Sequence, residues 1–536
     1  MEKIFTPGGL TLYLETFLAQ FFIIPYLGAL ITALLLATAS VLTAFICKRI
    51  EQATPLYALW FLPAAALLFM HYNINYHPQG TIAFIFALVA IYFYIGVRRF
   101  NYRLLAGFIA VLLLYWWAGA IANLFAVCIL LWEAINRTKH GYWIILIVVE
   151  AVCISLGSVY FSVLGEYKFA FLPDFYFRKE LKPEWGIYYS WIILPIILLG
   201  AFLFRKRKPI NTKREIIESL VHIALIAGIF YGDTKKMDDP KLRNQAQMNY
   251  YSRTSQWDKM ITLNKERTTD PVQLAYINRA LAEKSVLADR MFTYSQHGMS
   301  GLLVPKYLSC LSSEIYFTLG YIAFSQELAF ETYIISMQMG DGSPYMLQRL
   351  VQTNLIYGEW PVAEKYLDRL EQTIFYKDWA KQHRKFLYND AEVENDALLG
   401  MKRKCISGNH LRNTFEIEQD LRILVSKNPE NHAAVEYLGA AYLLTKNKDA
   451  FLRFVRTLLG TPALPNLPVS YQEALLLFET DAQTLEKYRI PLDVVQRFES
   501  FKAQSSSKVN NPQVMIRSFG DTYWFYYTFY KEKQQP

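Results

Sequence analysis

Long apolar runs, cut by short polar or basic segments, fill the chain up to about Gly232, and the remainder contains none. Each run is about as long as a helix needs to cross a hydrocarbon core of roughly 30 Å. The pattern predicts spans over residues 22–47, 56–70, 81–97, 143–164, 187–204 and 216–231. We therefore expect a polytopic transmembrane helical domain over 1–232 and a soluble helical domain over 233–536, within an all-α fold.

The apolar stretch 104–135 is too long for one ordinary crossing. It contains Gly119 and Asn123 but neither Lys nor Arg, so we expect a break near 118–123 and two short crossings. The chain then has about eight spans. The break also places every basic cluster on one side, which the positive-inside rule favours. These clusters are Lys48 with Arg49, Arg98 to Arg103, Arg137 with Lys139, and Arg205 to Lys208.

The basic clusters also set the expected orientation of the chain. With these clusters in the cytosol, the amino terminus and everything after Gly232 lie outside the membrane, which in a bacterium is the periplasm. A start on the outside is unusual without a preceding span, so we expect a first helix ahead of this start. Glu133 lies near the basic side, and we expect it to reach water or an arginine there.

Composition fits this division of the chain. Charged residues make up 19% of the sequence and aromatic residues 16%, a bias that lipid-facing helices and interfacial aromatic belts produce. The formal net charge is +9, but the basic clusters mark topology, so no nucleic-acid partner is expected. No C-x-x-C spacing occurs. Cys310 and Cys405 could pair in an oxidising compartment, and the sequence leaves their pairing open.

The second half reads as helix after helix, with apolar residues at three- and four-residue steps. In LQRLVQTNLIYGEWPVAEKYLDRL, Gly358 falls at a turn and Trp360 opens the second helix. In NHAAVEYLGAAYLLTKNKDAFLRFV, Gly439 lies in the first helix and Phe451 in the second. A small residue in such a pair lets two helices approach closely. We expect a tetratricopeptide-like helical repeat, with an irregular helical bundle as the alternative.

Two apolar segments of this half have alternative interpretations. The stretch 300–335 contains Glu314 and Glu327, which make it a poor membrane span. We expect a buried helical hairpin there, with a surface that docks onto the membrane half as the alternative. The aromatic tail 523–527 is expected to pack back as a cap on the repeat, with ligand stacking as the alternative.

Signatures of common catalytic sites do not occur. The sequence has no GxxxxGK[ST], no GxGxxG after a strand, no GxSxG and no HExxH. A soluble hydrolase or ATPase is therefore not expected, and we predict neither a metal site nor a cofactor. Glu150 lies in the middle of a predicted span, where a carboxylate is costly, so it is the candidate for an intramembrane functional residue.

The predicted external segments support an enzymatic alternative. They contain Glu15, His77, Glu166 and Asp174. Lipid-carrier glycosyltransferases of the C-fold have many spans and a catalytic carboxylate in an early external loop, and this chain resembles them in topology only. A carboxylate there could deprotonate an acceptor or hold a divalent cation, with a polyprenyl-phosphate sugar as the donor. No paired motif such as D-x-D is present in these segments.

One resemblance covers nearly the whole chain. It rests on the segments GGLTLYLETFLAQFFIIPYLGALI, SSEIYFTLGYIAFSQELAFE, LQRLVQTNLIYGEWPVAEKYLDRL and FGDTYWFYYTFY. They are similar to an uncharacterised family of Bacteroidota multi-pass membrane proteins, described only as a domain of unknown function. The resemblance implies a bacterial inner-membrane location and a further hydrophobic helix ahead of the GGL segment. It implies no catalytic residues.

The pattern as a whole favours a binding or scaffolding protein of the cell envelope. A periplasmic helical repeat would hold a protein or an envelope polymer beside the lipid bilayer. The C-fold glycosyltransferase is the second hypothesis. A transporter is the third, and it is the weakest because no internal inverted symmetry is evident.

Overall fold

The computed structural model describes residues 6–51, 57–136, 140–178, 181–204, 212–237, 239–263, 268–304, 308–338, 343–406, 417–479, 486–506 and 512–530. The chain divides into two compact units, Met1–Asp239 and Pro240–Pro536, which we call the N-terminal and C-terminal units. Within the described residues every regular element is a helix, and isolated bridges are the only β-type contacts. The all-α prediction is confirmed.

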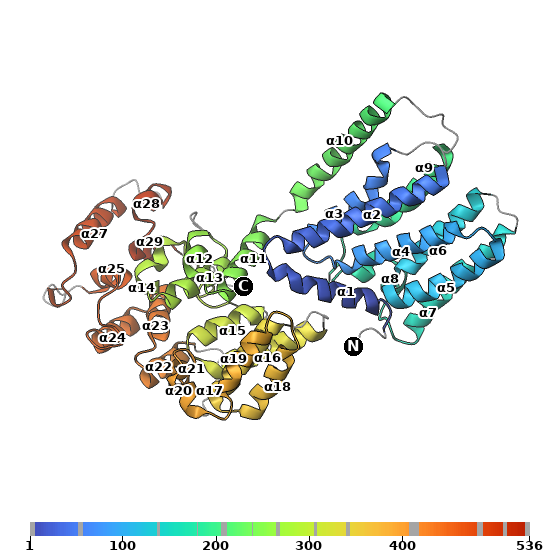
Figure 1. The fold of residues 1–536 in the computed structure, drawn as a ribbon. Coiled ribbons are helices and arrows are strands. Elements are labelled where there is room, and N and C mark those ends of the chain that lie inside the picture. The colour runs from blue at the N-terminus through green and yellow to red at the C-terminus, as the bar shows by residue number, and fades with distance from the viewer. Residues whose placement is uncertain are drawn as a thin grey trace. The chain divides into compact units, whose positions relative to one another are not determined.

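The N-terminal unit consists of α-helices joined by short 3-10 turns (Figure 1). Its helices are α1 (Gly9–Ala19), α2 (Leu27–Glu51), α3 (Leu62–His71), α4 (Gln79–Gly96), α5 (Phe100–Ala118), α6 (Ile121–Ile135), α7 (Ile145–Tyr160), α8 (Tyr167–Phe171), α9 (Tyr189–Phe204) and α10 (Thr212–Met237). The 3-10 turn η3 (Tyr57–Phe61) leads into α3. Helix α4 is central, because it packs against α1, α2, α5 and α6.

Five helical segments of the described chain are long and apolar enough to cross a membrane. They are Leu27–Ile50, Gln79–Gly96, Phe100–Ala118, Gly141–Tyr160 and Trp185–Leu203. Gly9–Ile23, Ala58–His71, Ile121–Ile135 and Ile216–Gly228 form shorter apolar helices. Three of the predicted crossings, at 56–70, in the second half of 104–135 and at 216–231, thus fall on apolar helical segments shorter than a full span, although α10, which contains the last of them, is 26 residues long.

The predicted break in the long apolar stretch is present between α5 and α6. Helix α5 ends at Ala118, and Gly119 takes φ +80°, a conformation that L side chains rarely adopt. A Cβ at Gly119 would lie 2.6 Å from the ring of Phe175, so the turn also needs a residue without a side chain at this position. Helix α6 begins at Ile121, and the apolar stretch therefore forms two helices rather than one.

Arg49 near the end of α2 and Arg103 near the start of α5 both contact the end of α4. The guanidinium of Arg49 stacks 3.9 Å from the centre of the Tyr92 ring on α4. Nη2 of Arg103 donates to Oε2 of Glu133 at 3.0 Å, and Tyr94 donates to Oε1 of the same carboxylate at 3.0 Å. Glu133 thus pairs with an arginine, as predicted. The clusters at 137–139 and 205–208 lie outside the described residues.

The C-terminal unit is also helical throughout its described residues. Its helices are α11 (Pro240–Arg253), α12 (Trp257–Leu263), α13 (Pro271–Glu283), α14 (Leu287–Arg290), α15 (Ser309–Thr318), α16 (Ile322–Gln338), α17 (Pro344–Tyr357), α18 (Trp360–Glu371), α19 (Lys377–His383), α20 (Asp390–Asn395), α21 (Leu399–Arg403), α22 (Ile417–Lys427), α23 (His432–Leu444), α24 (Lys448–Leu458), α25 (Val469–Phe478), α27 (Leu492–Ser505), α28 (Pro512–Phe519) and α29 (Tyr523–Phe529). Consecutive helices commonly pack as pairs, among them α15 with α16, α17 with α18, and α23 with α24.

The two helix pairs expected from the sequence are present. Gly358 ends α17 in the left-handed conformation, with φ +78°, and Trp360 begins α18. In the second pair, Gly439 lies in α23 and Phe451 in α24. A Cβ at Gly439 would collide with the Tyr471 hydroxyl on α25, so this glycine admits a third helix at close range.

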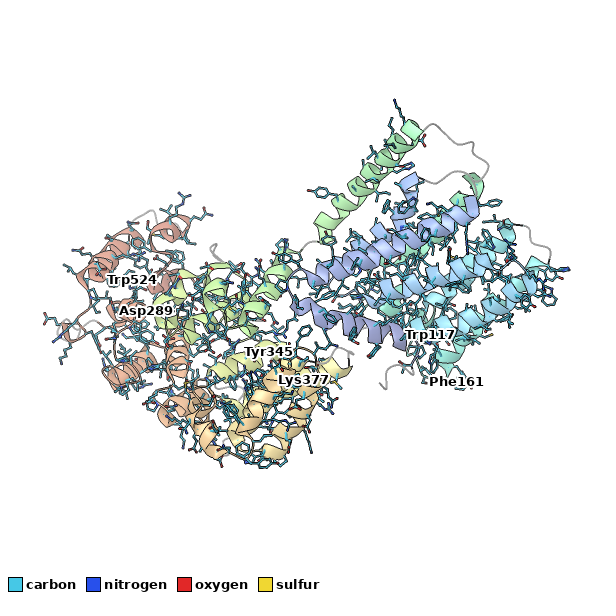
Figure 2. The ribbon with its side chains drawn as sticks, in the orientation of Figure 1. Trp117, Phe161, Asp289, Tyr345, Lys377 and Trp524 are labelled. Carbon is cyan, nitrogen blue, oxygen red and sulfur yellow. The ribbon has the colours of Figure 1, made fainter. Side chains whose placement is uncertain are left out.

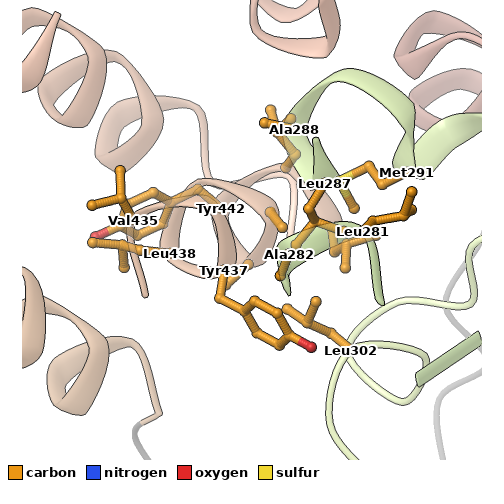
Figure 3. Close-up of a cluster of buried hydrophobic side chains, with 14 of the residues drawn as sticks. Leu281, Ala282, Leu287, Ala288, Met291, Leu302, Val435, Tyr437, Leu438 and Tyr442 are labelled. Atoms are coloured by element: carbon orange, nitrogen blue, oxygen red, sulfur yellow. The ribbon is translucent and has the colours of Figure 1, made fainter. Parts of the chain in front are cut away.

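The largest core of the C-terminal unit joins its first and later helices. Figure 3 shows Tyr437 of α23 on the side of that helix that faces Leu281 of α13 and Leu287 of α14. These segments lie far apart in the sequence. The shared core therefore joins early and late helices of the unit, which is not a row of independent helix pairs. Cys310 and Cys405 are both free thiols, and Cys405 is buried.

The two ambiguous apolar segments can now be located. Helices α15 and α16 pack against each other with Ser309, Glu314 and Leu328 buried, so this part forms a helical hairpin as expected, although Phe330 and Ile335 in the second half of α16 are exposed. The aromatic tail forms α29, where Trp524 is fully buried and donates to the backbone oxygen of Glu473 at 2.7 Å. Figure 2 shows Trp524 among the C-terminal helices. The tail therefore packs back onto the unit, as predicted.

Candidate functional site

Helix α1 brings Glu15 against the segment that precedes α4. Glu15 is 7% exposed, and its Oε1 lies 3.5 Å from Nδ1 of His77. Its other oxygen, Oε2, is buried and has no hydrogen-bond partner among the described residues. A buried carboxylate oxygen without a partner is costly, because it has lost its hydration without a replacement. The Glu15–His77 pair therefore leaves one carboxylate oxygen without a hydrogen bond among the described residues.

Polar side chains from the start of α4 surround this pair. Gln79 donates from Nε2 to the Thr11 hydroxyl of α1 at 3.1 Å. The Tyr76 hydroxyl shares a hydrogen bond of 3.2 Å with Thr81, and Nε2 of His71 lies 2.9 Å from the same Thr81 oxygen. These residues form a polar network of two hydrogen-bonded groups at this end of the unit, one of Gln79 with Thr11 and one of Thr81 with Tyr76 and His71.

Tyr76 links that network to the Glu15 carboxylate electrostatically. Burial raises the pKa of Tyr76, its hydrogen bond to Thr81 opposes this, and the nearby negative charge of Glu15 raises it further. The Tyr76 phenol therefore stays protonated and can only donate or accept a neutral hydrogen bond. The sequence analysis selected Glu15 and His77 but missed the network around them. The polar run HYNINYHPQG before an apolar helix was the available signal.

The segment 172–178 is bonded onto the helix ends beside this network. The Tyr176 hydroxyl donates to the backbone oxygen of Ala118 at 2.5 Å and accepts from the backbone nitrogen of Ile121 at 3.1 Å. It thereby satisfies the backbone groups that the break between α5 and α6 leaves open. The backbone nitrogen of His77 donates to the backbone oxygen of Tyr176 at 2.9 Å. The two predicted external loops are therefore joined to each other and to the bundle.

The other two predicted carboxylates have different partners. Asp174 is 5% exposed and accepts a hydrogen bond from the Tyr188 hydroxyl at 2.6 Å. Glu166 is exposed and pairs with Nζ of Lys168 at 2.9 Å. Of the four candidates, the structure pairs Glu15 with His77, whereas Asp174 and Glu166 each form a separate local contact.

Glu150 lies in the middle of α7, as the sequence analysis placed it. The residue is half-buried, and its Oε2 is buried without a hydrogen-bond partner in the part of the chain that the structure describes. Such a group in an apolar helix is a functional candidate by default. The described side chains around it define no role for this carboxylate.

A buried ionic cluster in the C-terminal unit was missed by the sequence analysis. Glu314 of α15 accepts from Arg279 of α13 and from Arg349 of α17, each at 2.8 Å. Burial acts to raise the pKa of Glu314, but the two arginines outweigh it and hold the pKa below its usual value. The cluster joins three helices in the interior, so we interpret it as a structural link. Within the described residues no group of three His, Cys, Asp or Glu side chains could hold a metal ion.

A pocket of about 310 Å³ lies beside α29, where its aromatic side chains face the segment 292–297. Phe525 and Phe529 line one side, and Tyr294 and His297 line another. Nε2 of His297 is buried and has no hydrogen-bond partner among the described residues, and burial lowers the pKa of this imidazole. The ring is therefore neutral near pH 7. The pocket offers aromatic faces and one unused polar atom, which suits an uncharged ligand.

Comparison with known proteins places the whole chain in one family. A model of a family of unknown function, DUF6057, matches residues 1–530. The chain belongs to this DUF6057 family. No curated protein matches the chain. No solved structure matches it either. The resemblance to a domain of unknown function is thereby confirmed, and membership of DUF6057 assigns no chemistry to the Glu15–His77 pair or to the aromatic pocket.

Proposed function

We propose that this DUF6057 protein is an integral membrane protein that binds a partner in the cell envelope through its C-terminal helical unit. In this proposal the N-terminal unit spans the inner membrane of a bacterium, and the C-terminal unit lies in the periplasm as a repeat-like binding domain. The aromatic pocket beside α29 is the single observation that carries the proposed binding role.

The lining of this pocket indicates the kind of partner. Phe525, Phe529 and Tyr294 present aromatic surface, and none of the described residues that line the pocket is Lys, Arg, Asp or Glu. An uncharged sugar ring or an apolar peptide side chain fits such a lining, whereas a charged group would lose its hydration without compensation. The unused Nε2 of His297 can accept a hydrogen bond from a hydroxyl or amide of the ligand. A polymer or protein of the envelope offers these groups.

The proposed membrane insertion and orientation rest on observations other than the aromatic pocket. Five helical segments have the length and hydropathy for crossing a membrane. Arg49 and Arg103 lie at the ends of helices away from the Glu15–His77 pair, which places the pair outside if the basic ends are cytosolic. A periplasm-active phosphatase fused after residue 240 should be active, and the same fusion after Arg49 should be inactive. The reverse pattern would contradict the orientation.

Binding can be tested with the full-length protein in detergent. Solubilised cell-wall polysaccharide and periplasmic protein extract are titrated separately while tryptophan fluorescence is recorded. We expect Phe529→Ala to weaken binding about ten-fold, because one aromatic wall of the pocket is lost. Phe330→Ala, which removes a Phe that is 48% exposed on α16, is the matched control. Equal binding by the two variants would exclude the pocket.

The Glu15–His77 pair supports a second candidate, a transferase that uses a lipid-linked sugar. Glu15 would take the proton of an acceptor hydroxyl. The acceptor oxygen would attack the sugar carbon bonded to the phosphate, and the polyprenyl phosphate would leave. The buried, unpartnered Oε2 of Glu15 is the observation that favours it. Glu15→Gln should then abolish transfer of labelled sugar into the envelope, with the protein still inserted in the membrane. A binding protein would keep its function in this variant.

A further inference from the structure

A groove of about 500 Å³ runs between α10 and the pair formed by α2 and α3 in the N-terminal unit. Its walls are apolar side chains from these three helices and from η3, chiefly Leu36, Phe61, Leu68, Ile223 and Ile226. The volume falls within the range of about 300–1,000 Å³ that is usual for ligand pockets. The groove is thus large enough for a ligand, although its helices are of the apolar type that packs tightly.

Small residues create the space. Ala37 and Ser40 of α2 line the groove opposite Ala227 of α10, and Ala64 and Ala65 line it from α3. Between apolar helices, small residues ordinarily let the backbones approach closely. In this groove they border an open space instead, so the surface that they form has no protein partner within the described residues.

The groove has a polar end. Its lining runs from Phe61, through α3, to Tyr72, and along α10 from Ile223 to Tyr231, so a tyrosine comes last in each segment. Tyrosine is typical of the level where a bilayer meets water. Tyr72 follows His71, whose ring contacts Thr81 in the polar network beside Glu15. The apolar space thus ends next to the most polar part of the unit.

We propose that this groove holds one hydrocarbon chain of a membrane lipid, with the lipid headgroup beside Tyr72 and Tyr231. The inference rests on the proposed membrane insertion of this unit. A single chain matches a space of this volume with apolar walls and one polar end. It also places a headgroup within reach of the polar network around the Glu15–His77 pair.

A helix from a second copy fits the groove less well. Helix α10 packs against η3 and α3, which closes the groove at the end near Phe61. A helix with its side chains is about 10 Å or more wide and needs an open path along its whole length. A flexible hydrocarbon chain needs no such path, because it can enter from the polar end or from the side.

The test uses full-length protein in detergent with phosphatidylethanolamine that carries a diazirine at the end of one acyl chain. After illumination, labelled peptides are identified by mass spectrometry at a low ratio of probe to protein. We expect labels to concentrate on α2, α3 and α10 at the groove. Ala37→Phe and Ala65→Phe fill the groove and should each reduce this labelling at least five-fold. Thr38→Phe, at an exposed position on another face of α2, should leave it unchanged.

Each other outcome overturns the inference. Labels spread evenly over exposed side chains of α5 and α7, such as Leu112 and Val149, would show an ordinary lipid-facing surface. Unchanged labelling in both Ala37→Phe and Ala65→Phe would also show that the groove holds no lipid chain, provided that gel filtration shows both variants folded. Disulfide-linked dimers of an Ala65→Cys variant would place a second copy in the groove. Absence of any labelling, together with release of the protein by alkaline carbonate, would instead disprove membrane insertion itself.

Discussion

Nη2 of Arg349 donates to both carboxylate oxygens of Glu314, at 2.8 Å each, in the interior of the C-terminal unit. Arg279 donates to Oε2 of the same carboxylate from α13. The guanidinium of Arg349 also lies 3.4 Å from the centre of the Phe317 ring. Because all three charged side chains are at least nine-tenths buried, the carboxylate compensates two guanidinium groups that have no bulk water around them.

Replacing Glu314 by Gln should destabilise the C-terminal unit strongly. The change keeps the shape of the side chain but leaves Arg279 and Arg349 without a negative charge, and removing one partner of a buried ion pair costs about 3–5 kcal/mol. Hydrogen exchange of peptides from α15 and α17 in urea measures the free energy of unfolding. Glu359→Gln, at an exposed position, is the control and should change it little. An unchanged unfolding free energy in Glu314→Gln would contradict the proposed structural link.

Glu473 should make the stability of the C-terminal unit depend on pH. Burial raises the pKa of Glu473 to about 8, although the backbone nitrogen of Tyr523 donates to its Oε2 at 2.7 Å and opposes this. The folded state therefore binds a proton that the unfolded state has released above its ordinary pKa. The stabilising contribution is complete below about pH 4.5 and is lost progressively as the pH rises to about 8.

A Glu473→Gln variant tests this directly. Glutamine can still accept from Tyr523 but cannot ionise, so the loss of stability between pH 5 and pH 8 should be smaller by a few kcal/mol, at about 1.4 kcal/mol per pKa unit. Burial also raises the pKa of Glu436 to about 8, so part of the dependence of stability on pH should persist in the variant. Parallel curves of stability against pH for the two proteins would show that Glu473 is not the source.

Gly439 and Tyr471 offer a test of the close approach between α23 and α25. Adding a methyl group at Gly439 creates a collision with the Tyr471 hydroxyl, and overpacking of this kind costs about 1–3 kcal/mol. Gly439→Ala should therefore lower the melting temperature of the unit. Tyr471→Phe alone should leave it unchanged or raise it, because the buried Tyr471 hydroxyl has no hydrogen-bond partner among the described residues.

The double variant of these two positions provides the control. Tyr471→Phe removes the nearest colliding atom, so Gly439→Ala should cost less in a protein that already carries Tyr471→Phe than in the wild type. Additive effects of the two substitutions would place the cause of the destabilisation elsewhere, for example in the contact of the new methyl group with Phe454.

Local features of this fold were predictable because they depend on neighbours in the sequence. Gly119 and Asn123 in an overlong apolar stretch predicted the break that the structure has between α5 and α6. Gly358 before Trp360 predicted a helix turn, since a left-handed residue there favours glycine. In both places the residue type itself reports the backbone conformation.

Contacts between distant segments were not predictable in the same way. Glu314 was recognised only as unfavourable for a membrane span, and its arginine partners lie 35 residues away on either side. Glu15 and His77 were selected as separate candidates, but only the packing of α1 against α4 brings them together. Asp174 was selected with them, and its hydrogen bond to Tyr188 depends on how the segment before α9 folds back.

The thiols of Cys310 and Cys405 should stay reduced and unreactive even in an oxidising compartment. Both are free in the structure, and Asn431 donates to Sγ of Cys405 at 3.5 Å. Burial raises the pKa of Cys310 to about 11, so little of the reactive thiolate is present near pH 8. We expect slow alkylation by maleimide in the native protein and rapid alkylation of both residues in urea. A faster-migrating band on a non-reducing gel that depends on both cysteines would show that they pair.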